Sequence, residues 1–350
     1  MSYITYTDMK AMILNKISDL KEDRAPLQLL DIPIPEPEEN EVRIKISVCG
    51  VCHTELDEIE GRLSPTKLPV VPGHQLIGLV EKLGKGTSKF KVGDRVGVAW
   101  IFSACGKCKF CLEGNENLCE DFLATGKDVN GGYAEYMTVP EKYAHAIPGF
   151  FTDAEAAPLL CAGAIGYRSI QLAQIKDGDN LGLTGFGASA HLVLKMVNYR
   201  YPNTKVFVFA RKAEERQFAM ELRAFWSGET ADASPKKLDA IIDTTPAWLP
   251  IVEALGNLEK GGRLVINAIR KEKGDQEYLQ KLSYRDHLWM EKEIKSVANV
   301  TAKDVSDFLE LAAKASIKPE VQMYPLERAN EALLELKEQK IRGAKVLQIL

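Results

Sequence analysis

The sequence has no excess of positive charge and no long uninterrupted apolar run. Its 350 residues include 45 Lys and Arg against 49 Asp and Glu, for a net charge of −4. Without a basic field the chain is a poor partner for nucleic-acid phosphates, and no stretch reaches the roughly 18 apolar residues of a membrane span. No basic segment followed by an apolar one marks a secretory signal at its start. We therefore expect a cytoplasmic protein that binds neither nucleic acid nor membranes.

Cysteine is scarce, and its placement is not that of a secreted disulfide framework. Of seven cysteines, Cys105, Cys108, Cys111 and Cys119 are separated by 3, 3 and 8 residues, with glycines between them. Four thiolates in one short loop are typical of a closed, tetrahedral, structural zinc site that leaves no position for substrate. A thiol redox sensor, in which these cysteines form disulfides reversibly, is the alternative.

The length suggests about two domains, since a typical domain has about 150 residues. The first 150 residues alternate in hydrophobicity over 41–48, 76–84, 92–100 and 131–139, with Gly and Pro between, which predicts an antiparallel β domain. Apolar runs beginning at 181, 205, 238 and 262 then alternate with helical segments. That rhythm predicts a parallel sheet covered by helices. A strand near 294–300, helices within 303–315 and 325–338 and a last strand at 344–350 complete the expected order.

A glycine-rich turn stands where the first strand of the parallel sheet meets its helix. Gly185, Gly187, Ala188 and Ser189 belong to a G-x-G-x-x-A pattern at this turn. Glycines there allow a cofactor pyrophosphate to approach the backbone at a helix N-terminus. We therefore predict a dinucleotide site, with a tight turn that binds no ligand as the alternative.

Two cations follow the second strand of this sheet. Arg211 and Lys212 stand where an acidic residue usually holds the adenosine ribose 2′-hydroxyl. Cations at that place suit a 2′-phosphate, which favours NADP over NAD. In the alternative, both are solvated residues at a helix start and the cofactor is NAD.

Three further metal-binding side chains are far apart in the sequence. Cys52, His74 and Cys161 lie within GVCHTEL, VPGHQLIG and PLLCAG, 22 and 87 residues apart. Together with the four-cysteine lobe (105–119), these segments resemble the zinc-dependent alcohol dehydrogenases of the medium-chain dehydrogenase/reductase superfamily. The resemblance runs from Lys10 to Leu350.

This resemblance implies a fold and an activity. The fold would be α/β plus β: a Rossmann doubly wound parallel sheet over 151–295, with a GroES-like antiparallel β domain over 1–150 completed by 296–350. The activity would be hydride transfer between an alcohol and a nicotinamide cofactor, with reduction of an aldehyde or ketone in reverse. The partners would be a small-molecule alcohol or aldehyde, two zinc ions per chain, and further copies of the chain in a dimer or tetramer.

The resemblance also implies the roles of the side chains around the scattered trio. Cys52, His74 and Cys161 would hold a catalytic zinc with a fourth position open for water or alcohol. The Thr54 hydroxyl would hand on the substrate proton, and His53 would contact the cofactor pyrophosphate. A turn threonine and a solvated histidine are the alternatives.

Residues further away complete the expected site. Arg342 would reach the nicotinamide-side phosphates, with a surface cation as the alternative. Ile59, Leu63 and Trp100 would line a pocket for apolar primary alcohols or aldehydes, with a core tryptophan as the alternative for Trp100.

Three positions depart from the family pattern. Glu55 replaces the aspartate that orients the zinc-binding imidazole, so the geometry around this ring could change. Asp57 stands where many relatives have a proton-relay histidine, and the resemblance makes its carboxylate a candidate catalytic proton acceptor. Gln75 replaces the glutamate that follows the ligand histidine, and the loss of this negative charge predicts a slightly more electrophilic zinc.

Other functions are compatible with parts of this pattern. A polyol or formaldehyde-type dehydrogenase shares the same scaffold. A non-catalytic paralogue that binds nucleotide and structural zinc is expected to lack the scattered trio, and all three of its residues are present. The sequence therefore favours an enzyme.

Overall fold

The computed structural model describes residues 7–338 and 343–350 and divides the chain into two compact units. The first unit comprises Met1–Cys161, Thr301–Ala313 and Lys318–Leu350, and the second Ala162–Val300 and Lys314–Ile317. Across the described ranges, no helix has both the length and the apolar character that a membrane crossing requires.

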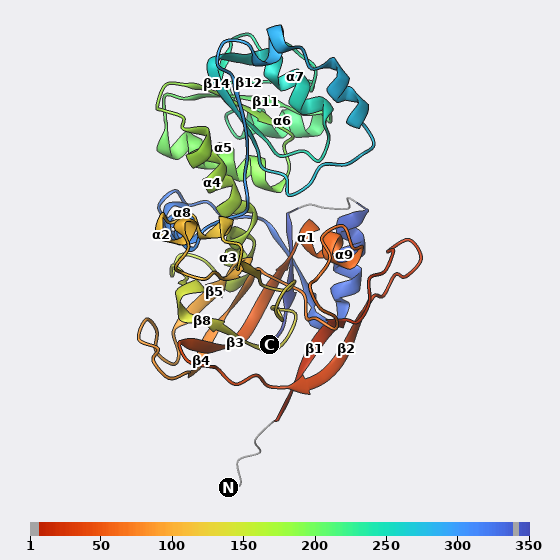
Figure 1. The fold of residues 1–350 in the computed structure, drawn as a ribbon, viewed down its shortest axis with the longest axis vertical. Helices are drawn as coiled ribbons and strands as arrows, with labels where there is room; N and C mark the ends of the chain where they lie inside the picture. The colour runs from red at the N-terminus through yellow and green to blue at the C-terminus, as the bar shows by residue number, and fades with distance from the viewer. Residues whose placement is uncertain (1–6, 339–342) are drawn as a thin grey trace. The chain divides into compact units, whose positions relative to one another are not determined.

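A seven-stranded sheet forms the centre of the first unit (Figure 1). Its strands are β16 (Val321–Pro325), β17 (Ala344–Gln348), β3 (Glu41–Val51), β4 (Leu76–Leu83), β5 (Arg95–Val98) and β9 (Ala144–Ala146) in order across the sheet, with β8 (Tyr136–Pro140) also paired to β3. All pairs are antiparallel except β16 with β17. Along β3, Val42, Ile44 and Ile46 alternate into the core, as the period of a half-buried strand requires.

Smaller elements surround this sheet. Two hairpins are formed by β1 (Asp8–Leu14) with β2 (Leu27–Pro33) and by β6 (Ile101–Ser103) with β7 (Leu123–Ala124). The helices of the first unit are α1 (His53–Ile59), α2 (Lys109–Leu112), α3 (Asp153–Ala156), α8 (Ala302–Lys314) and α9 (Ala329–Lys337). The last residue of α8, Lys314, is assigned to the second unit. Short 3-10 turns are η1 (Glu116–Leu118), η2 (Glu141–Tyr143), η3 (Ala157–Leu160) and η6 (Leu326–Arg328).

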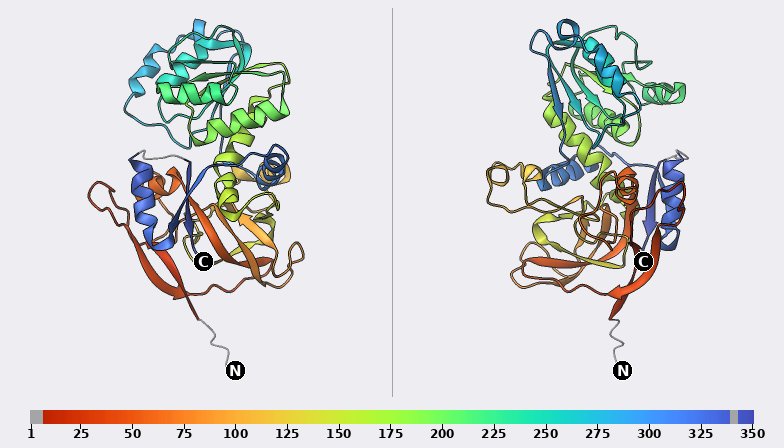
Figure 2. Two further views of the ribbon diagram at one scale, coloured as in Figure 1. Left: turned by 180° about the vertical axis from the view of Figure 1, so that it is seen from behind. Right: turned by 45° about the vertical axis from the view of Figure 1, so that its right-hand side comes forward.

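The second unit is built on a six-stranded, all-parallel sheet (Figure 2). The strands run in the order β12 (Trp226–Gly228), β11 (Lys205–Phe209), β10 (Asn180–Thr184), β13 (Leu238–Asp243), β14 (Leu258–Ile266), β15 (Glu293–Ser296). Its helices are α4 (Ala162–Ala173), α5 (Ala188–Arg200), α6 (Ala213–Glu221) and α7 (Leu249–Asn257), with a 3-10 helix η4 (Gln276–Lys281) and a π-helical turn η5 (Tyr284–Leu288). The strand order reverses between β10 and β13, which is where doubly wound sheets bind ligands.

The predicted antiparallel β domain and parallel sheet are confirmed, with local differences. The strand expected over 131–139 begins only at Tyr136, because Gly131, Gly132 and Tyr133 donate their backbone N–H groups to 71–73 instead. Neither the β1–β2 hairpin nor α4 was expected from the sequence.

Candidate metal and nucleotide sites

Helix α1 begins at the end of β3, and its first turn positions Cys52. Cys52 is the N-cap: its Sγ accepts from Thr54 N at 3.3 Å, and its own N–H donates to Glu55 Oε2 at 2.9 Å. This reciprocal capping box satisfies backbone donors that the helix start would otherwise leave open. The same bonds therefore fix both the thiol and the glutamate.

The loop that carries His74 is held by a second loop. Gly131 N donates to Val71 O at 2.7 Å, and Gly132 N donates to Gly73 O at 2.8 Å. Gly73 has a φ of +98°, and a Cβ there would lie 2.4 Å from Tyr133 Cδ1. Only glycine fits this close approach, so the path of the chain into His74 is tightly constrained.

Cys52, His74 and Cys161 meet in the first unit despite their distance in sequence. One ligand atom from each lies within 4.8 Å of the others, and Cys52 Sγ is 3.6 Å from His74 Nε2. On the other side of the ring, Glu55 Oε1 lies 2.6 Å from His74 Nδ1. A proton on Nδ1 shared with Glu55 leaves Nε2 as the ligand atom that faces the cysteines.

The electrostatics of this trio suit a cation. The hydrogen bond with Cys161, burial and the charge of Glu55 raise the pKa of the Cys52 thiol well above its usual value. Burial alone would lower the pKa of His74, but the charges of Glu55 and Cys52 outweigh it and raise this pKa well above its usual value. The negative charge of Glu55, which raises both pKa values, would also favour a divalent cation bound between the ligand atoms.

The four cysteines of the lobe also converge. Their ligand atoms lie within 4.8 Å of one another. Cys108 N donates to Cys105 Sγ at 3.4 Å, and the backbone N–H groups of Lys107 and Cys108 lower the pKa of Cys105 to about 6. The lobe is tied to α8, because Ala302 N donates to Glu116 Oε1 at 3.1 Å. The four thiols fit a tetrahedral metal ion that would hold the loop in its closed conformation.

The residues expected beside the trio have different surroundings. Thr54 is half-buried and His53 is exposed at the start of α1. Asp57 is buried and accepts a hydrogen bond from Arg62 Nε at 2.6 Å, so this carboxylate belongs to an ion pair. Gln75 is buried, and its Nε2 has no hydrogen-bond partner among the residues that the structure describes.

The three expected pocket walls are not equivalent. Ile59 has no exposed surface and packs in the core of the first unit, because it lies on the inner face of α1. Leu63 is half-buried, and its N–H donates to Asp57 O at 2.9 Å. Trp100 is half-buried against Phe122, with ring centroids 5.3 Å apart. Ile59 is therefore a core residue, and partly exposed surface is present at Leu63 and Trp100.

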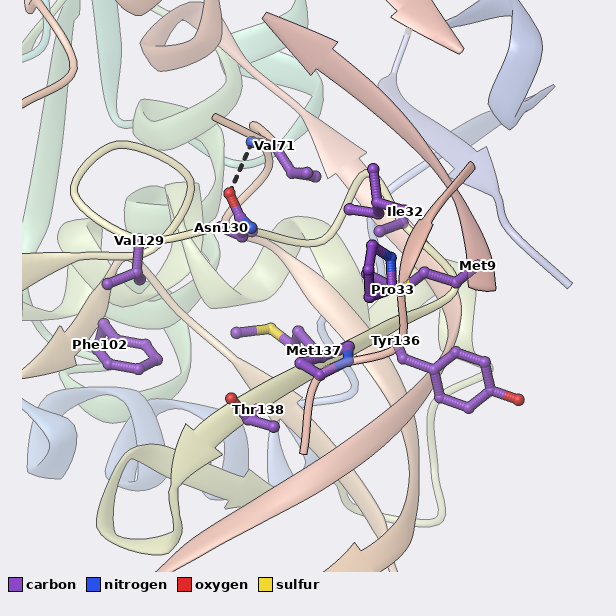
Figure 3. Close-up of a pocket in the computed structure, with 13 residues that line it drawn as sticks. Met9, Ile32, Pro33, Val71, Phe102, Val129, Asn130, Tyr136, Met137 and Thr138 are labelled. Carbon is purple, nitrogen blue, oxygen red and sulfur yellow. Dashed lines mark hydrogen bonds between the residues drawn. The ribbon is translucent and has the colours of Figure 1, made fainter. Parts of the chain in front are cut away.

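A cavity of about 230 Å³ lies elsewhere in the first unit (Figure 3). Its walls are mainly apolar and include Met9, Ile32, Phe102 and Met137. Asn130 Oδ1 accepts from Val71 N at 3.1 Å at its edge. None of the predicted metal ligands or pocket walls lines this cavity.

The glycine-rich turn connects β10 to α5 in the second unit. Gly185 has a φ of +75° and donates to Phe209 O at 2.8 Å. Gly187 caps α5, and both Gly187 and Ala188 are exposed, with nothing within 4 Å of a Cβ at Gly187. Ser189 instead donates its hydroxyl to Ala162 O at 3.1 Å, which ties α5 to α4.

The two predicted phosphate-binding cations follow β11. Arg211 and Lys212 are exposed, and Lys212 is the N-cap of α6. Arg216 supports the turn, because its Nη1 donates to Ala210 O at 2.9 Å and to Arg211 O at 3.1 Å. Arg342 lies outside the described residues.

Sequence reasoning missed two charged residues at the carboxyl ends of the parallel strands. Asp243 ends β13 and is fully buried, and Lys271 follows β14 and pairs with it. A carboxylate closing the apolar run LDAIID was a signal for Asp243, because parallel strands end at the ligand-binding edge of such sheets. No local signal pointed to Lys271.

Comparisons with known proteins agree over nearly the whole chain. Residues 38–149 match the model of the alcohol dehydrogenase GroES-like domain. A probable alcohol dehydrogenase of Mycobacterium tuberculosis is 39% identical, covering 93% of this chain and 94% of that protein. An alcohol dehydrogenase of Geobacillus stearothermophilus is 32% identical, covering 97% and 99%. A solved cinnamyl alcohol dehydrogenase of Sorghum bicolor superposes with a TM-score of 0.82 at 25% identity, covering 97% of each chain.

Proposed function

This chain belongs to the zinc-type medium-chain alcohol dehydrogenases, which are NAD(P)-dependent oxidoreductases, and we propose that its reaction takes place at Cys52, His74 and Cys161. The observation that carries the proposal is the meeting of these three donors within 4.8 Å. The proposed substrate is a small apolar primary alcohol, or the corresponding aldehyde in reverse, in contact with Leu63 and Trp100.

The trio fits a catalytic zinc, since two thiols and one imidazole leave a fourth position. A zinc ion bound there would supply Lewis-acid polarisation of the substrate oxygen. Glu55 would hold the His74 ring in orientation. The half-buried Thr54 hydroxyl would hand on the substrate proton, taking it up on its oxygen while it releases its own. Asp57, in its ion pair with Arg62, would be the acceptor of the released proton.

The lobe cysteines would hold a second, structural zinc, which gives two zinc ions per chain. In the second unit, we propose that Gly185, Gly187 and Ala188 receive the cofactor pyrophosphate at the start of α5. Arg211 and Lys212 are exposed beside β11, which supports a contact with a 2′-phosphate and hence NADP. We propose that the first unit, which includes Cys161, is the catalytic domain and the second unit the dinucleotide-binding domain. Their bounds differ by several residues from the 1–150 with 296–350 and the 151–295 expected from the sequence.

We propose further that the chain acts in the cytoplasm as a homo-oligomer. All four residues of the edge strand β15 are exposed, and Ile294 is 44% exposed. In an antiparallel pair of β15 strands centred on Ile294, Glu293 of each copy would lie opposite Lys295 of the other. The pair would therefore contain two Glu–Lys contacts. Replacing Ile294 with Arg should yield monomers in light scattering, and an unchanged mass would contradict this interface.

The proposed activity can be tested directly on the purified protein. A panel of alcohols and aldehydes is assayed with NADPH, NADH and their oxidised forms, together with elemental analysis for zinc. We expect about two zinc ions per chain and turnover that Cys161→Ser reduces by a factor on the order of 1,000, because one metal ligand is lost. Full activity after removal of all zinc would refute the proposal.

A further inference from the structure

A buried ion pair lies at the carboxyl ends of the central strands of the parallel sheet. Asp243, the last residue of β13, has no exposed surface, and its Oδ2 accepts from Lys271 Nζ. The side chain of Lys271 is only 9% exposed. Thr184, the last residue of β10, is the register partner of Asp243. The pair therefore lies at the point where the strand order reverses.

Lys271 joins two segments of the chain, its own loop and the segment 243–247. Besides Asp243, its ammonium donates to Thr245 O at 2.6 Å and to Ala247 O at 3.2 Å. These three acceptors match the three donors of an ammonium group. The loop after β14 is thereby fastened to the loop after β13. Because its donors are already used, Lys271 is placed to position backbone and not to bind a phosphate itself.

Asp243 extends this network to β10. Its Oδ1 accepts from Thr184 Oγ1 at 2.6 Å and from Thr245 Oγ1 at 2.8 Å. Thr244 donates through both its N–H and its hydroxyl to Thr184 O, each at 3.0 Å. One carboxylate thus organises the ends of two neighbouring strands.

The glycine-rich turn lies directly against this network. Gly185 follows Thr184, and a Cβ at Gly185 would lie 2.8 Å from Thr245 Cγ2 and 3.0 Å from Thr244 Oγ1. Any shift in the backbone of Thr244 and Thr245 would therefore change the space around Gly185. The peptides of this turn are those to which the cofactor pyrophosphate has been assigned above.

We infer that Lys271 is a positioning residue for cofactor binding, which holds the segment 244–247 against the glycine-rich turn. This inference rests on the proposed cofactor site. Loss of the Lys271 donors leaves two backbone carbonyls and a buried carboxylate without their partner. The loop then relaxes, and the turn no longer presents one fixed arrangement to the cofactor.

The test measures the dissociation constant of NADPH and of NADH by fluorescence, with zinc content, melting temperature and kcat at saturating cofactor. The variants are Lys271→Met, Lys271→Arg and the double variant Lys271→Met with Asp243→Asn. Lys273→Met is the matched control, because Lys273 is an exposed lysine of the same loop.

We expect Lys271→Met to raise both dissociation constants about tenfold or more, with zinc content unchanged and kcat within about twofold. Lys271→Arg should stay within about threefold of the wild type, since a guanidinium retains the charge and several donors. The double variant should recover the melting temperature lost by Lys271→Met, because no buried charge is left unpaired, while its dissociation constants stay raised. Lys273→Met should bind like the wild type.

Two results would overturn the inference. The first is a double variant in which both the melting temperature and the dissociation constants return to the wild-type values. That result would mean that Lys271 only stabilises the fold. The second is equal binding by the wild type, Lys271→Met and Lys273→Met. If Lys271→Met does not fold, Lys271→Arg and the double variant still decide between these outcomes. A wild-type protein that binds neither NADPH nor NADH refutes the proposed function itself, and the inference with it.

Discussion

Glu55 Oε1 lies 2.6 Å from His74 Nδ1, while the other oxygen of the same carboxylate accepts the N–H of Cys52 at 2.9 Å. One buried side chain therefore positions two of the three proposed zinc ligands. The same carboxylate closes the capping box of α1 and reaches across to the loop that carries His74.

Replacing Glu55 with Gln should weaken zinc binding at the trio by about 10- to 100-fold, since the amide lacks the charge that orients and polarises the imidazole. The measurement is competition for zinc with a chelator of known affinity. Glu55→Asp keeps the charge and should lose less affinity. Equal affinity in Glu55→Gln and the wild type would contradict this role.

Gln75 provides a second test of the trio's electrostatics. It is buried directly after His74, and its Oε1 lies 2.6 Å from the position of a Cβ at Gly50. Gln75→Glu adds a negative charge there, so alcohol oxidation should reach half of its maximal rate at a higher pH than in the wild type. The pH profile of turnover measures this shift, and an unchanged profile would count against a role for Gln75 in tuning the metal.

Removing one cysteine of the lobe tests whether the two proposed zinc sites bind metal independently. Cys111→Ser is expected to bind one zinc ion per chain in place of two and to melt at a lower temperature, because the lobe depends on the metal for its closed shape. Turnover at low temperature should stay within about threefold, since the trio is intact. Cys49→Ala, which changes a cysteine outside both clusters, should keep both zinc ions. Loss of both ions in Cys111→Ser would show that the sites are not independent.

The sequence was most informative where the functional residues lie within short motifs. Cys52, His74 and Cys161 could be found because each lies in a distinctive local motif, and the lobe could be found because its ligands are close in sequence. Folding brings the trio to within 4.8 Å, but no spacing rule connects residues 22 and 87 positions apart without the family resemblance.

Features set by tertiary packing could not be predicted in the same way. Ile59 looked like a pocket wall by its position, yet the face of α1 on which it lies is turned into the core. Nothing in the sequence indicated that Arg62 Nε would lie 2.6 Å from Asp57 Oδ1, so the ion pair around this proposed proton acceptor could not be predicted. The partner of Asp243 is 28 residues away in an irregular loop, and the β1–β2 hairpin has a 12-residue connection, too long for a turn signature to predict its register.

Cofactor choice should depend on the two cations after β11. Replacing both Arg211 and Lys212 with Ala should lower the ratio of kcat/KM for NADPH to that for NADH by about tenfold or more, because charge-assisted contacts to a 2′-phosphate are lost. Lys236→Ala removes an exposed cation elsewhere in the second unit and should leave the ratio unchanged. A wild-type preference for NADH would already overturn the assignment of these residues.

His145 predicts how stability changes in mild acid. It is buried on β9 with its Nδ1 2.9 Å from Ser306 Oγ, and burial, with a smaller effect of the Lys89 charge, lowers its pKa to about 3. The unfolded chain has an ordinary histidine pKa of about 6.5, so between these two values it binds more protons than the folded chain. The contribution of His145 to the free energy of unfolding is therefore complete above about pH 6.5. It decreases as the pH falls below that value, by up to about 1.4 kcal/mol per pH unit.

The measurement is the urea midpoint of the zinc-loaded protein between pH 7 and pH 5, compared with His145→Asn. Asparagine cannot take up a proton, so this variant should lose stability less steeply on acidification than the wild type does. His287→Asn, a change at a partly exposed histidine of the second unit, should keep the wild-type slope. Parallel slopes for the wild type and His145→Asn would mean that the imidazole is accommodated in its charged form, because only a neutral buried ring links protonation to unfolding.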